Sequence, residues 1–443
     1  MSQFDKQLEQ RYLELLDSVP LESLQPEAQL IAFERLKKQR IYHKRLIQTT
    51  ISVAILMIAF IGSIRVSPAI AHAVAQIPGL KPIVEMIAFD KGIEDIVNND
   101  YFEQMNESQT INGKTLTITG VVADESGMII SYKLKSDEDL SLFTGVTPEV
   151  KQKDKLVNAG VVYGWTYPPG GTYEVEDTIN VTAASQGMDY SSRDFVLKLA
   201  LRERPETVFE IPFTLKKEIK ASKRFTINKK LTVDGQRFTI HELIISPIRS
   251  ELRMSIDSSN SKKILKFDDI RLYDENKEEW GKIRNGVVGF GEYKDEQFSI
   301  LLESNYFRMP ESITIEMRKI EAIDKADEFI VVDFGKKKVI SHLNTIDIEL
   351  EVKDNYEIEY KVPSYKNKNE HKGVFNNLID ADGEIYRSYS VWISPQKNYM
   401  LIGQHFDMEN AEKPPTNPVK LDIARYEQYL NGTGRIKVEL NSE

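Results

Sequence analysis

The sequence predicts a mainly β protein whose tandem β-sandwiches lie outside a membrane, after a short helical segment and one transmembrane helix. Three observations support this fold class. Residues 46–64 carry no charged side chain. From about residue 108 onward, short stretches alternate polar and apolar residues between turn sequences, which is typical of β-strands. Strand pairs of this kind recur further along the chain, which indicates repeated domains.

Residues 1–45 are predicted to form two helices. The first carries apolar residues at three- and four-residue spacing and ends at Pro20, and the second begins near Pro26. We call the apolar residues of the first helix the N-terminal stripe: Phe4, Leu8, Tyr12, Leu15 and Leu16. A stripe of this size is too small to build its own core. It therefore either docks on a partner protein or packs against the second helix, and the sequence leaves both alternatives open.

Residues 46–64, LIQTTISVAILMIAFIGSI, are predicted to cross the membrane. Nineteen helical residues extend roughly 28 Å, which is close to the thickness of a hydrocarbon core. A buried core helix is the weaker interpretation because the segment has no polar face. A signal peptide is also disfavoured, because 45 residues precede the segment, although Ala71-His72-Ala73 offers a peptidase an Ala-x-Ala pattern.

Basic residues predict the orientation of this helix. Six Lys or Arg residues lie within residues 35–45, whereas only Arg65 and Lys81 lie close to the other end. Because short basic segments stay in the cytoplasm, we expect a cytoplasmic N-terminus and an extracellular C-terminus at the cell membrane. The residues expected to anchor the chain in the membrane are Arg40, Lys44, Arg45, Leu46, Ile55, Leu56, Phe60, Ile64 and Arg65.

The extracytoplasmic part is predicted to contain a helical juxtamembrane region and three β-sandwich domains. Ile93, Ile96 and Val97 have helical spacing, and the predicted strands begin near residue 108. We expect domain boundaries at the basic segments 216–220 and 336–338, although both could be the charged ends of long strands. The resulting division is 1–45, 46–64, 65–107, 108–218, 219–336 and 337–443.

A pair of strands recurs in this region. Residues 115–119 follow the Asn112-Gly113 turn, and residues 128–134 are predicted to pair with them. Residues 235–244 with 251–256 form a second copy, and residues 344–352 with 356–362 form a looser third copy. The repeats predict three sandwiches of similar construction.

The composition offers little chemistry. The chain has no cysteine, so disulfides, thiolate chemistry and cysteine-containing zinc sites are excluded. Its six histidines are far apart in the sequence, and no nucleophile motif has its companion motifs. We therefore expect no enzymatic activity and no catalytic, cofactor or metal site. The net charge of −10 makes nucleic acid a poor direct partner.

Two segments resemble a known family. The run RVSPAIAHAVAQIPGLKPIVEMIAFDKG at 65–92 is similar to the start of an uncharacterised ectodomain family of Gram-positive, spore-forming bacteria. Members are described as membrane-anchored anti-sigma-factor-like proteins, and many continue into an immunoglobulin-like domain of unknown function. Residues 231–236, Trp280-Gly281 and residues 302–307 resemble that second domain.

The resemblance implies a signalling role in which the cytoplasmic segment holds a sigma factor inactive until an envelope event releases it. The expected partners are then the membrane, a sigma factor and an unknown extracytoplasmic ligand or protein. This chain lacks the zinc-binding His/Cys domain that many anti-sigma factors carry before the span. The alternative is a structural or ligand-binding protein of the cell envelope, in which the N-terminal segment is only an anchor.

Overall fold

The computed structural model describes residue 14 and residues 90–164, 168–183, 187–281, 288–290, 298–341, 343–363, 373–406 and 413–440. The chain divides into two compact units, Met1–Pro68 and Ala69–Glu443, and every described residue except Glu14 belongs to the second. No helix of the described residues has the length and apolar character that a membrane span requires. The predicted span 46–64 lies outside the described residues.

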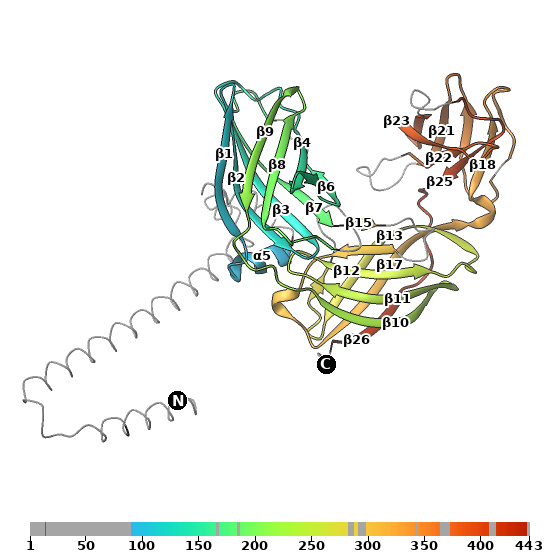
Figure 1. The fold of residues 1–443 in the computed structure, drawn as a ribbon. Helices are drawn as coiled ribbons and strands as arrows, with labels where there is room; N and C mark the ends of the chain where they lie inside the picture. The colour runs from blue at the N-terminus through green and yellow to red at the C-terminus, as the bar shows by residue number, and fades with distance from the viewer. Residues whose placement is uncertain are drawn as a thin grey trace, which may run out of the picture. The chain divides into compact units, whose positions relative to one another are not determined.

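Residues 103–214 form two antiparallel sheets, which we call the first sandwich (Figure 1). One sheet has the order β1 (Glu103–Ile111), β2 (Lys114–Asp124), β3 (Gly127–Ser136), β7 (Glu174–Ala183), β6 (Ala159–Tyr163). The other has the order β5 (Lys155–Leu156), β4 (Val146–Gln152), β8 (Asp194–Leu201), β9 (Arg204–Thr214). Residues from both sheets, such as Ile130 and Leu199, share one buried core.

The local sequence explains these strands. In β8 the exposed or half-buried residues alternate with Phe195, Leu197, Leu199 and Leu201, which are buried, so one face of the strand covers the core. Asn112 and Gly113 join β1 to β2 with φ values of 48° and 74°, which suits the two-residue turn that their sequence predicts. The sequence predicts that the strands begin near residue 108, which has to be corrected, because β1 begins at Glu103.

The second sandwich has the same strand order as the first. Its larger sheet runs β10 (Lys223–Val233), β11 (Gln236–Ile245), β12 (Ser250–Ile256), β16 (Phe298–Leu302), β15 (Val288–Phe290). Its other sheet runs β14 (Glu279–Trp280), β13 (Lys262–Asp274), β17 (Ser312–Asp324), β26 (Gly434–Glu439). The predicted hairpins are confirmed, since β2 pairs with β3, β11 with β12, and β20 (Glu349–Val352) with β21 (Glu357–Pro363).

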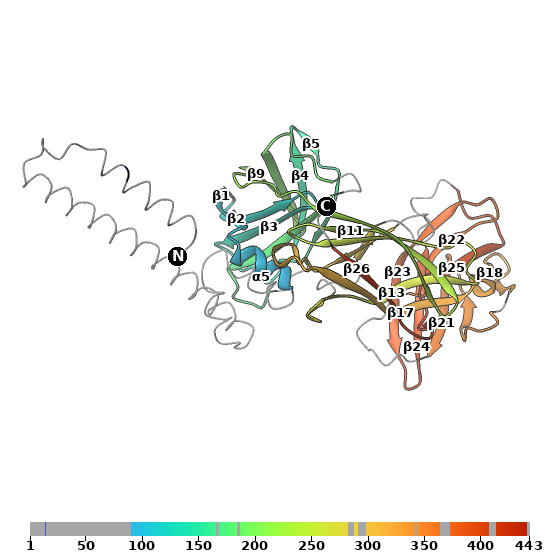
Figure 2. The same cartoon turned by 90° about the horizontal axis from the view of Figure 1, so that it is seen from below.

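The last strand, β26, completes the second sandwich rather than the third domain. It pairs with β17 from Ser312↔Glu439 to Met317↔Gly434 (Figure 2). The division at residue 336 therefore has to be corrected: residues 434–439 belong to the second sandwich, and the third set of strands is inserted between β17 and β26. The predicted boundary at 336–338 instead falls in the turn that joins two strands of the insertion, β18 and β19.

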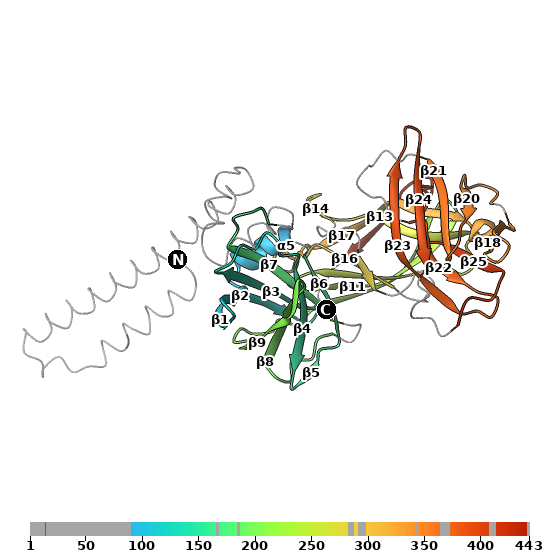
Figure 3. The ribbon, with the colours of Figure 1, turned by 90° about the horizontal axis from the view of Figure 1, so that it is seen from above.

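We call the inserted strands the inserted sheet (Figure 3). Their order is β19 (Lys338–Val339), β18 (Phe329–Asp333), β25 (Val419–Ile423), β22 (Phe375–Ile379), β23 (Ile385–Pro395), β24 (Tyr399–Phe406), β21, β20. Its core includes Leu265 and Ile323, which come from β13 and β17. The β13–β17 hairpin therefore contributes to two cores.

The described helices are short. They are α5 (Lys91–Asn98) and the 3-10 turns η1 (Tyr306–Arg308) and η2 (Lys325–Asp327). Helix α5 confirms the helical spacing of Ile93, Ile96 and Val97. The described chain is thus mainly β and built from several sheets, as the sequence predicts.

Candidate functional site

Helix α5 lies where the first and second sandwiches meet, and we treat this junction as the candidate functional site. Asp90 caps the N-terminus of the helix, and its side-chain Oδ1 accepts the backbone N–H groups of Gly92 at 2.8 Å and Ile93 at 3.3 Å. Asn99 caps the C-terminus, and Asp100 follows with a φ of 52°.

A small apolar cluster fastens α5 to both sandwiches. Ile93 and Ile96 are buried against Val122 and Ile129 of the first sandwich and Ile248 of the second. Tyr101 is also buried in this cluster, and its ring centroid lies 5.7 Å from that of Phe307. Because residues from three segments share one core, α5 cannot leave the junction without exposing apolar surface of both sandwiches.

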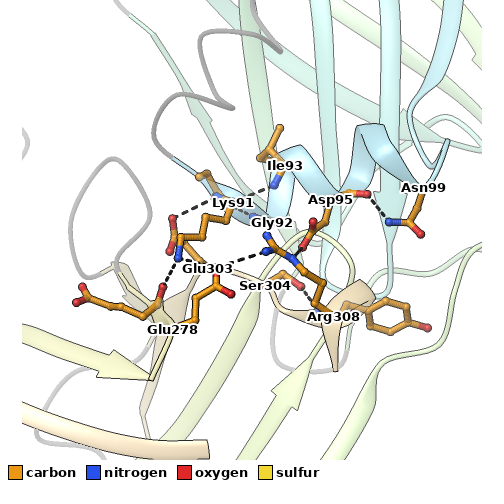
Figure 4. A network of polar contacts seen from close by, with 12 residues as sticks. Lys91, Gly92, Ile93, Asp95, Asn99, Glu278, Glu303, Ser304 and Arg308 are labelled. Carbon is orange, nitrogen blue, oxygen red and sulfur yellow. Dashed lines mark hydrogen bonds and ion pairs between the residues drawn. The ribbon is translucent and has the colours of Figure 1, made fainter. Parts of the chain in front are cut away.

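Charged side chains connect α5 directly to the second sandwich (Figure 4). Lys91 Nζ lies 2.9 Å from Glu278 Oε1 and donates to the backbone oxygen of Glu279 at 2.8 Å. Arg308 Nε, on η1, donates to Asp95 Oδ2 at 2.7 Å. Arg308 also lies 3.4 Å from Glu278, so one carboxylate receives two cations. Such networks act more strongly than isolated surface ion pairs.

Trp280 lies beneath the same cations. Lys91 Nζ is 5.3 Å and Arg308 Cζ is 4.7 Å from the centre of its ring, and Trp280 is only 1% exposed. These distances allow cation–π attraction. Gly92 permits close approach at this point, because a Cβ there would lie 2.9 Å from the backbone oxygen of Ser304.

Burial controls the ionisation of the acidic groups. Removal from water, followed by the nearby Glu303 carboxylate, raises the pKa of Asp90 to about 7. Burial also raises the pKa of Asp95, against the opposing effect of its hydrogen bond from Arg308. Glu303 accepts the backbone N–H of Gly281 at 2.9 Å and of Lys91 at 3.4 Å. The junction thus holds carboxyl groups in a water-poor environment.

A second buried polar contact lies at the end of β2. Asp124 Oδ2 accepts the backbone N–H of Ile248 at 2.6 Å, and its Oδ1 accepts that of Ser126 at 2.7 Å. Burial raises the pKa of Asp124, and burial lowers the pKa of the neighbouring Arg249. Arg249 hydrogen-bonds to Thr182 Oγ1 of β7. This contact therefore joins both sandwiches through polar side chains.

The chain between β9 and β10 is also held at the junction. Glu103 accepts the backbone N–H groups of Lys216 and Lys217, with shortest distances of 3.0 Å for each. Tyr101 accepts the N–H of Lys220 at 3.0 Å and donates to the oxygen of Ala123 at 2.7 Å. The predicted boundary segment 216–220 is thus a connection fixed by hydrogen bonds.

We call the contacts that α5 makes with the two sandwiches the clasp. They are ion pairs, backbone hydrogen bonds and apolar packing. Within the ranges that the structure describes, no cluster of three or more His, Cys, Asp or Glu side chains could hold a metal ion. A clasp can couple a distant event to α5 if it has two stable arrangements.

The N-terminal stripe and the membrane-anchoring residues, from Arg40 to Arg65, are outside the described residues. The junction residues Asp90, Asp95, Asp124, Arg249 and Arg308 were not predicted. A partial signal was present, because Asp90 and Gly92 end the run 65–92 and Ser304 and Phe307 lie in the run 302–307, the two segments that carry the family resemblance.

Comparisons with known proteins give two family matches. Residues 42–136 match a domain of unknown function, DUF4179, and residues 222–352 match a family of unknown function, DUF5643. Each match covers less than half of the chain. No curated protein matches. A crystal structure of a conserved domain protein from Bacillus anthracis is similar over 54% of this chain and 84% of its own, with 13% identity and a TM-score of 0.36.

Proposed function

We propose that this chain is a single-pass membrane regulator, anti-sigma-factor-like, with an immunoglobulin-like sensory or docking region outside the cell. The first family match supports the proposal, because it runs from before the predicted span to the end of β3 and because that family is associated with anti-sigma-factor-like proteins. The N-terminal stripe would hold a sigma factor at the inner face of the membrane.

The observation that carries the proposal is the attachment of α5 to the second sandwich. The predicted span ends at Ile64, and 26 residues, 65–90, separate it from Lys91, the first residue of helix α5. Its Asp95 and Lys91 bind Arg308 and Glu278, which are more than 180 residues further along the chain. An event on the second sandwich would therefore reach α5, the described element that is nearest in the sequence to the predicted span.

The mechanism follows from this connection. A ligand, a pulling force or a protease that favours the separated sandwiches over the joined ones would release α5 and change the segment that leads to the membrane. In the joined state the N-terminal stripe keeps the sigma factor bound. In the separated state the sigma factor is released.

The first experiment captures proteins from native cells with residues 1–45 as bait. We expect a sigma factor to be recovered and to be lost with Leu8→Asp and Leu15→Asp. The control adds the same charges on the opposite face of the predicted helix, with Gln3→Asp and Gln10→Asp, and should retain the sigma factor. Failure of the unchanged bait to recover a sigma factor would remove the anti-sigma interpretation.

A second experiment tests orientation. Because the chain has no cysteine, a single cysteine reports its own position unambiguously. Ser108→Cys, on the exposed edge of β1, should react with an impermeant maleimide on intact cells. Ser2→Cys should react only after the membrane is opened. The reverse pattern would overturn the proposed topology.

One observation favours the alternative, a ligand-binding envelope protein whose N-terminal segment is only an anchor. β23 of the inserted sheet exposes Ile385, Tyr389 and Trp392, with exposed fractions of 61%, 69% and 42%. Exposed aromatic side chains are typical of binding surfaces. In this alternative, the substitutions at Leu8 and Leu15 leave transcription unchanged while Trp392→Ala weakens binding of a ligand outside the cell.

A further inference from the structure

A cavity of about 60 Å³ lies between the first and second sandwiches. Its walls include Ser126 and Thr182 of the first sandwich and Ser246 and Arg249 of the second. Ser222, from the connection between them, completes this part of the wall. Since one water needs roughly 10 to 15 Å³ of such volume, the cavity has room for a few atoms of a small molecule.

Arg249 is the unusual group in this wall. The residue is 6% exposed, and its Nε has no hydrogen-bond partner in the part of the chain that the structure describes. Another of its nitrogens, Nη1, donates to Thr182 Oγ1. A buried guanidinium with an unused N–H is unfavourable, because the group has lost water without gaining an acceptor. An acceptor in the cavity, either a water or an oxygen of a ligand, would satisfy this N–H.

Three hydroxyl groups in the wall also have protons to donate. Thr182 Oγ1 accepts from Arg249, which leaves its own proton available. Ser222 Oγ and Ser246 Oγ lie 2.7 Å apart, and a pair of hydroxyls that share one hydrogen bond keeps one further proton to donate. Together with Arg249 Nε, these groups supply three donors from both sides of the junction.

The other charged groups in the wall are already engaged. Glu251 accepts from Arg253 Nε at 2.8 Å and from Ser299 at 2.5 Å, while Glu125 accepts the backbone N–H of Ser222 at 3.0 Å. Three arginines and two glutamates line the cavity in total, namely Arg224, Arg249, Arg253, Glu125 and Glu251. Behind the wall, Asp124 acts on Arg249, and Glu242 pairs with Arg224 and Arg253, so the excess of one positive charge is offset and the site suits a singly charged anion rather than a dianion.

We propose that this cavity binds a small monocarboxylate, held by Arg249 Nε and the hydroxyls of Thr182 and the Ser222–Ser246 pair. A carboxylate has about four lone-pair positions, enough for these three donors. Because the donors come from both sandwiches, the bound anion stabilises the joined state by mass action. The inference deepens the proposed sensory function by naming the class of ligand that the junction recognises.

The test measures binding to the purified full chain in detergent by titration calorimetry. The probes are sodium acetate and sodium propionate, with sodium chloride at matched ionic strength as the reference. We expect saturable binding of a carboxylate that Thr182→Val weakens roughly tenfold, the loss of one hydrogen bond to a charged group. Thr110→Val, on the exposed part of β1, is the matched control and should bind as the unchanged chain does.

Arg249→Gln should abolish binding altogether. If that variant does not fold, Thr182→Val still decides, because it keeps the shape of the side chain and removes only the hydroxyl. Heats equal to those of sodium chloride for both carboxylates, or an unchanged affinity in Thr182→Val, would overturn the proposal. Calorimetry measures binding of the carboxylate without a sigma factor. A negative result here is therefore distinct from a negative result in the capture experiment.

Discussion

Arg308 Nε donates to Asp95 Oδ2 at 2.7 Å and thereby joins the turn after β16 to helix α5. The two side chains differ in environment, since that of Asp95 is 8% exposed and that of Arg308 is 41% exposed. Burial raises the pKa of Asp95, and the hydrogen bond from Arg308 opposes this effect. Loss of the arginine would leave a buried carboxyl group without its cationic partner.

A double-mutant cycle with Arg308→Met and Asp95→Asn should reveal this coupling. We expect an interaction free energy of about 1 kcal/mol, reduced by the partial exposure of Arg308, from chemical unfolding of the full chain. The control cycle uses Lys361 and Glu349, whose side chains are 47% and 71% exposed at 2.7 Å. Equal coupling energies for the two cycles would show that the junction pair has no special role.

Gly92→Ala should loosen α5 from the second sandwich. An added Cβ would lie 2.9 Å from the oxygen and 3.0 Å from the nitrogen of Ser304, and a backbone neighbour cannot move aside cheaply. We expect a net loss of about 1 kcal/mol in the free energy of unfolding, because overpacking outweighs the gain from replacing glycine in a helix. Faster amide hydrogen exchange in α5 should accompany it.

The matched control is Gly170→Ala. No atom lies within 4 Å of the position that its Cβ would occupy. Its effect on unfolding should stay within about 0.5 kcal/mol. If amide hydrogen exchange in α5 is the same in Gly92→Ala as in the unchanged chain, the helix and Ser304 separate readily. That result would contradict the idea that the clasp holds α5 in place.

The parts of the fold that sequence could predict are local. The turn at Asn112 and Gly113 and the alternation on either side of it determine the β1–β2–β3 unit, because both signals act over a few neighbouring residues. The same holds for β11 with β12. Helix α5 was recognisable from Ile93, Ile96 and Val97, which all lie on one face of a helix.

The insertion between β17 and β26 could not be predicted in this way. Residues 434–439 form a strand whose partner, β17, lies more than 100 residues earlier in the sequence. The residues around 434–439 do not indicate which strand they pair with. Likewise, Asp90, Asp124 and Arg249 look like surface residues in the sequence. Their burial depends on how two sandwiches meet, which is a tertiary property that a single sequence does not display.

Asp90 predicts a dependence of stability on pH. Burial raises its pKa from 3.8 to about 7, so the folded chain keeps this proton at pH values where the unfolded chain has lost it. The stability from this group is complete below about pH 4 and is lost as the pH rises to about 7, at most about 1.4 kcal/mol per pH unit. Burial also raises the pKa of Glu321 to about 7, with the same sign.

Asp90→Asn separates the contribution of Asp90 to the pH dependence from that of Glu321, since asparagine still caps the helix but does not titrate. Unfolding free energies at pH 5 and pH 8 should differ less in this variant than in the unchanged chain. Asp100→Asn serves as the control, because the Asp100 side chain is 97% exposed. A pH dependence that is the same in Asp90→Asn as in the unchanged chain would exclude Asp90 as its source.

The insertion makes the second sandwich depend on the end of the chain. β26 contributes Val438 and, just beyond it, Leu440 to the core, with exposed fractions of 6% and 5%. Burial of each such side chain is worth roughly 1.5 to 3 kcal/mol, and the strand also covers the edge of β17. A chain that ends at residue 430 should therefore lose amide protection in β17. Retained protection there would show that β26 is dispensable.

Two variants separate loss of the strand from loss of chain length. Val438→Ser should destabilise the second sandwich, whereas Lys437→Ser, at the neighbouring exposed position, should have little effect.

Conversely, removal of residues 325–427 should be tolerated with a short glycine-rich linker. The two ends are already adjacent, since Ala322 N donates to Gln428 O at 2.8 Å and Leu430 N to Ile320 O at 2.9 Å.

This deletion should also carry Leu265→Thr and Ile323→Thr, because both side chains would otherwise lose the core of the inserted sheet and face water. Protection of β17 in the deleted chain, together with its loss in the chain that ends at 430, would establish that the second sandwich needs its last strand and not the domain inserted before it. Loss of protection in both chains would instead mean that the inserted sheet and the second sandwich fold as one cooperative unit.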